Sequence, residues 1–70
     1  MDEQEFLHKV SVSTNVNIEV LKELTGNEKF FTLIRTGKTT DATILLRNTI
    51  PRIGLTEAKK VVDAFIEEYK

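Results

Sequence analysis

The fold is set by residues 55–69, which read LTEAKKVVDAFIEEY. Apolar residues recur in this stretch at spacings of three and four, and these spacings place them on one face of an α-helix. Polar and charged residues fill most of the other positions. The stretch therefore predicts an amphipathic helix over residues 55–69, with an inward face made of Leu55, Ala58, Val62, Phe65, Ile66 and Tyr69.

A second helix is predicted over residues 40–50, directly before the first. Thr40 is a suitable N-cap, and Asp41 suits the first turn of a helix. Pro51 cannot continue the helix, because its ring fixes φ and it has no backbone N–H group. The two helices would form a hairpin, and the positions of the second that can face inward are Ala42, Leu45, Leu46 and Thr49.

Two shorter helices are predicted upstream of this hairpin. Asn17 can cap a helix that ends at Gly26, and Asn27 can cap another that ends at Gly37. The second of these carries two adjacent phenylalanines at positions 30 and 31. Adjacent side chains of a helix point about 100° apart, so we expect one ring in the core and the other nearer the surface.

The sequence of the N-terminal segment is compatible with two kinds of secondary structure. Residues 10–18 alternate between β-branched and polar side chains, which is typical of a strand. A single strand cannot satisfy its own backbone hydrogen bonds, and it would need a partner strand from another chain. The other interpretation is a helix over residues 2–12 that ends near Ser13, with Phe6, Leu7 and Val10 facing inward.

We favour the helical interpretation and predict an all-α domain, a small bundle of four or five short helices that ends in a helical hairpin. The alternative is an α+β fold with an N-terminal strand that pairs across a dimer. The chain has 70 residues, which is enough for one domain spanning residues 1–70. A core of this size rarely contributes more than about 3–5 kcal/mol, so packing or association must supply the rest.

The composition excludes much of the usual chemistry. The chain has no cysteine and a single histidine, His8, so it offers neither a disulfide nor a thiolate or histidine cluster for zinc. Gly37-Lys38-Thr39 lacks the upstream glycine of a phosphate-binding loop. We therefore expect no catalytic, cofactor-binding or metal-binding residues.

Localisation is inferred from the same composition. No apolar run approaches the roughly 20 residues that span a membrane. The first residues are acidic, whereas a signal peptide begins with basic ones. We expect a cytoplasmic protein that does not bind membranes.

Charge is distributed unevenly along the chain. Residues 1–28 hold six acidic and two basic side chains, whereas residues 29–60 hold two acidic and seven basic ones. Such a basic region can steer an acidic partner toward it. Equally, the acidic ends could neutralise the basic middle within the molecule, and the sequence leaves both interpretations open.

The hairpin region resembles a known interaction module. Residues 54–63 read GLTEAKKVVD, which is similar to the G-L-x-E-A-K-x-x-V-E signature of the C-terminal domain of the bacterial ribosomal stalk protein. Arg47 resembles the arginine that precedes the turn in that family, and the resemblance extends over residues 33–65. The turn itself differs, since residues 50–54 read IPRIG, and the family's flanking strands have no counterpart in this sequence.

The resemblance implies a helical hairpin that contacts a protein through its basic face. Members of that family contact translation GTPases in this way. Carried over by position, the resemblance implies contacts by Arg47, Gly54 and Lys59.

Our leading hypothesis is a non-catalytic adaptor or modulator, of the kind encoded by phages and mobile elements, that docks on a larger host protein. The partner would have an acidic surface, and the residues expected to bind it are Arg47, Arg52, Gly54, Lys59 and Lys60.

The alternative is a nucleic-acid-binding protein, namely a small dimeric transcription regulator that uses residues 10–18 as a β-ribbon. The basic hairpin could also contact RNA. The net charge of −1 argues against nucleic acid, because phosphate binding needs an excess of basic residues. A homodimer or self-assembling subunit is a further hypothesis, and an enzyme has the least support.

Overall fold

The computed structural model describes residues 2–69, and this part of the chain folds into five α-helices with no strand. The prediction of an all-α bundle is confirmed, and the α+β alternative is wrong. The helices are α1 Glu3–Thr14, α2 Ile18–Thr25, α3 Glu28–Arg35, α4 Thr39–Thr49 and α5 Leu55–Tyr69.

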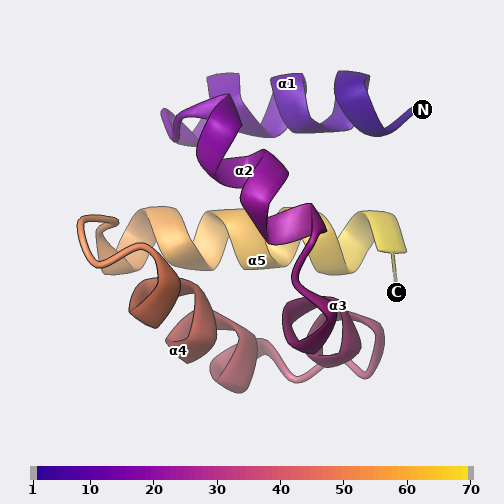
Figure 1. The fold of residues 1–70 in the computed structure, drawn as a ribbon, viewed down its shortest axis with the longest axis vertical. Helices are drawn as coiled ribbons and strands as arrows, with labels where there is room; N and C mark the ends of the chain where they lie inside the picture. The colour runs from indigo at the N-terminus through magenta and orange to yellow at the C-terminus, as the bar shows by residue number, and fades with distance from the viewer. Residues whose placement is uncertain (1, 70) are drawn as a thin grey trace.

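Helix α5 lies in the middle of the bundle, as Figure 1 shows, with α1 along one side and α4 along the other. It packs against α1, α3 and α4, whereas α2 crosses between α1 and α3 and packs against both. The predicted hairpin is therefore present as α4 and α5, joined by residues 50–54. The longest helix therefore supports α1, α3 and α4, and α2 is held by α1 and α3.

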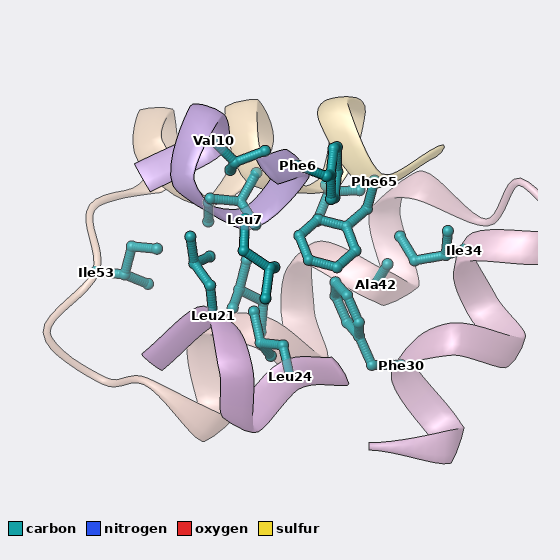
Figure 2. Packing of buried hydrophobic residues seen from close by; sticks show 14 residues of the cluster. Phe6, Leu7, Val10, Leu21, Leu24, Phe30, Ile34, Ala42, Ile53 and Phe65 are labelled. Carbon is teal, nitrogen blue, oxygen red and sulfur yellow. The ribbon is translucent and has the colours of Figure 1, made fainter. Parts of the chain in front are cut away.

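The core is centred on an aromatic cluster. The ring of Phe65 makes T-shaped contacts with Phe6 of α1 and Phe30 of α3, with ring centroids 5.1 and 5.4 Å apart. Figure 2 shows these rings among the aliphatic side chains of α1 and α2. Tyr69 and Phe31 extend the cluster toward the surface. Burial, followed by the nearby Glu3 and Glu68 carboxylates, raises the pKa of the Tyr69 hydroxyl above its ordinary value.

The N-terminal segment is helical because its buried residues follow a helical spacing. Phe6, Leu7, Val10 and Thr14 are buried, whereas Val12 is 71% exposed. In a strand, Val10, Val12 and Thr14 would share one face. The prediction that the helix ends near Ser13 is confirmed, since α1 ends at Thr14.

The turn that ends α1 uses a left-handed residue. Asn15 has φ 60° and ψ 30°, a conformation that asparagine tolerates better than most residues. The Ser11 hydroxyl donates to the carbonyl of Val16 at 2.6 Å and ties the turn back to the helix. The chain therefore reverses direction within three residues, and α2 begins at Ile18 under its predicted N-cap, Asn17.

The junction between α3 and α4 explains why one predicted cap is wrong. Gly37, at φ 71°, donates to the carbonyl of Ile34, and Lys38 donates to that of Leu33, which together form a Schellman motif. The carbonyl of Lys38 already accepts from Ala42. Helix α4 therefore begins at Thr39, with Lys38 at the N-cap position, and Thr40 lies inside the helix instead of capping it.

The two hairpin helices bury a slightly different face from the predicted one. Thr49 and Leu55, both expected to face inward, are exposed, and Leu55 is 55% exposed. Val61, which was not expected to face inward, is fully buried. The burial of Val61 rotates the buried stripe of α5 away from Leu55. The remaining inward positions of α5 are buried or half-buried, as predicted.

Among single substitutions, we expect one in the aromatic cluster to lower the free energy of unfolding the most. Phe65→Ala removes two T-shaped contacts and leaves a cavity, which costs about 3–5 kcal/mol. A domain this small has about that much stability in total, so we expect a largely unfolded protein by circular dichroism at 222 nm. Val12→Ala, on the exposed face of α1, should change the free energy of unfolding by less than about 0.5 kcal/mol. A folded Phe65→Ala variant with an unchanged urea midpoint would contradict this account of the core.

The left-handed turn gives a second prediction. Asn15→Ala should destabilise the protein by about 1 kcal/mol, because alanine is strained at positive φ. Asn15→Gly should be neutral or stabilising, because glycine adopts this conformation without strain. Urea denaturation of the two variants measures the difference. Equal stabilities would argue for an extended backbone at this position and against the helix–turn–helix path.

Candidate functional site

A groove lies between the outer faces of α4 and α5, next to the loop that joins them. Its volume is about 540 Å3. Residues 39–48, which make nearly three turns of α4, form one wall, and residues 55–59 at the start of α5 form the other. The lining residues are Thr39, Thr40, Thr43, Ile44, Arg47, Asn48, Pro51, Leu55 and Lys59.

The groove gathers exposed apolar side chains. Ile44 and Leu55 are each 55% exposed, and they face the groove from α4 and α5. Ile44 lies two residues after the fully buried Ala42, which places it about 200° around the helix axis, on the outer face. Among residues 2–69 the only other exposed large hydrophobic residue is Val12. The groove therefore concentrates apolar surface that the fold itself leaves uncovered.

The ionisable residues that line the groove are both basic. Arg47 and Lys59 are exposed, one on each helix, and the lining contains no acidic residue. Within the described part of the chain, the one ion pair joins Lys22 to Glu19 at 3.7 Å, far from this region in sequence. The guanidinium of Arg47 and the ammonium of Lys59 therefore have no carboxylate of residues 2–69 within 4.0 Å.

Threonine and asparagine side chains supply the polar part of the wall. The Thr43 hydroxyl donates to the carbonyl of Thr39 at 2.8 Å, so its proton is already used within α4. Thr40 and Asn48 are exposed on the same helix. The groove thus combines an apolar centre, two cations and a few hydrogen-bonding groups. This combination suits the binding of a peptide or protein segment.

The five predicted contact residues are all exposed, but they do not line one surface hollow. Arg47 and Lys59 lie in the α4–α5 groove, whereas Arg52 and Gly54 line a second hollow of about 450 Å3 beside the α1–α2 turn. Lys60 lines neither hollow. Gly54 stands against the Glu57 carboxylate, which a side chain at position 54 would displace. This neighbour is the end of a flexible side chain and the φ of Gly54 is not positive, so the backbone at this position does not require glycine.

Ile44 was not among the residues predicted from the sequence, and Leu55 was predicted to lie in the core. Leu55 lies within the apolar period of α5, and its exposure depends on which neighbours cover the first turn. Ile44 was detectable, because it falls outside the apolar stripe of its own helix. An apolar residue on the polar face of an amphipathic helix is the sequence signal that identifies this groove.

Within residues 2–69 there is no group of three or more histidine, aspartate or glutamate side chains placed to hold a metal ion. The buried side-chain nitrogen and oxygen atoms of these residues all have hydrogen-bond partners. None of the described helices combines the length and apolar character needed to cross a membrane.

The chain matches no protein-family model, and neither the curated proteins nor the solved structures contain a match to it. The resemblance of residues 33–65 to the ribosomal stalk domain therefore stays a prediction, although the helical hairpin that it implied is present as α4 and α5. The contacts that it implies for Arg47, Gly54 and Lys59 are proposals.

The exposure of the groove predicts that its apolar residues contribute little to folding. The double variant Ile44→Ser/Leu55→Ser should lose less than about 1 kcal/mol of stability, because both side chains are already largely hydrated. Leu46→Ser, a fully buried position of the same helix, should lose more than about 2 kcal/mol. Urea denaturation measures both, and a large loss in the double variant would make the two residues structural.

Proposed function

We propose that this protein is a non-catalytic adaptor or modulator that docks on a larger protein through the basic face of the α4–α5 hairpin. The observation that carries the proposal is the meeting of exposed Ile44 and Leu55, in one groove, with Arg47 and Lys59, which have no ion-pair partner among residues 2–69. Interfaces commonly bury an apolar centre within a polar rim, and arginine is enriched in them.

Charge supports an acidic surface on the partner. The basic side chains of the hairpin lie on exposed positions and attract an acidic protein over roughly a Debye length, about 8–10 Å at physiological salt. Complementary charge accelerates association and excludes basic proteins. The proposal includes Arg52 and Lys60 as peripheral cations of the same face.

Nucleic-acid binding has weaker support. The ribbon mechanism needs residues 10–18 as a strand, but they form the end of α1, a turn and the first residue of α2. That mechanism is therefore wrong. Contact between the hairpin and RNA stays untested, and the net charge of −1 does not favour it.

The proposal also covers the cellular location of the protein and the kind of genome that encodes it. We place the protein in the cytoplasm, and we regard it as a modulator of host machinery of the kind that phages and mobile elements encode. The chain has no cysteine, so no disulfide ties it to an oxidising compartment.

Affinity capture from the cells that produce the protein tests the proposal. The bait is the full chain, compared with a quadruple variant in which Arg47, Arg52, Lys59 and Lys60 become glutamate. We expect at least a tenfold loss of the captured partner, because charge reversal replaces attraction with repulsion. Mass spectrometry identifies and quantifies what is captured.

A matched control separates this face from net charge. Glutamate at Lys9, Lys29, Arg35 and Lys38, all exposed, changes the net charge by the same amount on other surfaces. We expect this variant to retain capture within about threefold, since long-range charge alone has a modest effect at physiological salt. Equal losses in both variants, or capture of nucleic acid in place of protein, would contradict the proposal.

A further inference from the structure

We infer that the α4–α5 groove binds an acidic amphipathic α-helix of the partner protein. This inference rests on the proposed function and specifies the chemistry of the segment that docks. It follows from three properties of the groove, namely its charge, its apolar centre and the absence of a strand edge from its walls.

Charge requires an acidic ligand. The two ionisable groups of the groove, Arg47 and Lys59, stand on opposite walls and are not paired with any carboxylate of residues 2–69. A helix lying between these walls can direct a carboxylate toward each. Arginine adds the planar geometry that suits bidentate carboxylate binding.

The apolar centre requires a ligand with an apolar stripe. Ile44 and Leu55 face the groove from different helices, and Pro51 lies at the end next to the loop. A ligand that covers both exposed side chains needs apolar residues on one face, spaced along the groove. In a helix this means residues i and i+4, or i and i+7.

The walls favour a helix over an extended peptide. Both are α-helices, whose backbone groups beyond the first turn bond within the helix and offer no ladder of donors and acceptors to an extended chain. An extended peptide that adds to a sheet needs a strand edge, which residues 2–69 do not contain, and a polyproline II peptide needs an aromatic-lined groove, whereas this groove has no aromatic residue in its lining. A helix satisfies its own backbone and contributes only side chains. Helix α4, with 11 residues, spans about 16 Å, so a ligand helix of about three turns matches it.

A second copy of this chain does not supply such a helix. Among residues 2–69 the exposed large hydrophobic residue outside the groove is Val12 alone, whereas the groove presents two. A symmetric dimer through the groove would place Arg47 and Lys59 of each copy against the same cations of the other, which is unfavourable. The partner is therefore a different protein.

Selection from a random library tests the inference without knowledge of the partner. A phage library of random 16-residue peptides is panned against the full-length protein at physiological salt. We expect enriched peptides with net negative charge and apolar residues spaced by four or seven. The synthesised peptides should gain helical circular dichroism on binding, and they should shift the backbone amide signals of α4 and the first turn of α5.

Variants locate the binding. Arg47→Glu/Lys59→Glu should weaken the selected peptides about tenfold or more, because each charge-assisted contact is lost and reversed. Ile44→Ser should weaken them about fivefold or more, because it removes apolar area from the centre of the contact. Lys9→Glu carries a charge reversal on α1, outside the groove and the basic hairpin face, and should change the affinity less than twofold.

Other outcomes overturn the inference. These are no enrichment, enrichment of basic or non-helical peptides, and binding that survives Arg47→Glu/Lys59→Glu. The affinity capture described above decides the proposed function separately, so an adaptor that uses another surface or another kind of segment is distinguishable. Groove shifts caused by a 12-nucleotide single-stranded RNA, weakening steeply with salt, would overturn both.

Discussion

The structure depends on the contact of one aromatic ring with two others. Phe65 of α5 meets Phe6 of α1 and Phe30 of α3, so a single side chain joins helices that are widely separated in the sequence. The chain has no cysteine, and its described residues hold no metal cluster, which leaves packing to supply the cohesion of this small domain. Because these contacts are non-local, they also fix which face of α5 is buried.

The position of this cluster determines where the surface groove lies. The rings gather at the C-terminal half of α5, where α1 and α3 cover it, and Figure 1 shows the N-terminal half running toward the α4 loop. Only α4 lines the outer side of that half at Leu55 and Lys59. In the first turn of α5, Ala58 is fully buried whereas Leu55 is 55% exposed, so Leu55 becomes part of the groove wall.

Local signals in the sequence were sufficient to predict where the helices lie. They were insufficient to predict which helix faces are buried by neighbouring helices. Asn17, Asn27 and Gly37 act through hydrogen bonds within a few residues, so the sequence predicts the ends that they define. The exposure of Leu55 depends on where α1 and α3 lie, and periodicity carries no such information. The alternating residues 10–18 left a strand open as the alternative for the same reason, because a strand and a helix end satisfy that pattern equally well until the burial of Phe6 and Val10 decides between them. Arg47 and Lys59 were predicted as contacts, but Ile44, which gives the groove half of its apolar centre, was not.

The uneven charge of the sequence allowed two interpretations, and the ion pairs separate them. If the acidic ends neutralised the basic middle directly, carboxylates of residues 1–28 or 61–70 would pair with bases of residues 29–60. In the described part of the chain the one ion pair, Lys22 with Glu19, lies entirely within the first of these segments. The bases of the middle segment thus have no carboxylate of residues 2–69 within 4.0 Å, and they are exposed to an external anion. An exposed cation beside an exposed apolar side chain gains most from a ligand that satisfies both, and for this reason we propose the groove, and not the lysines of the other faces, as the binding surface.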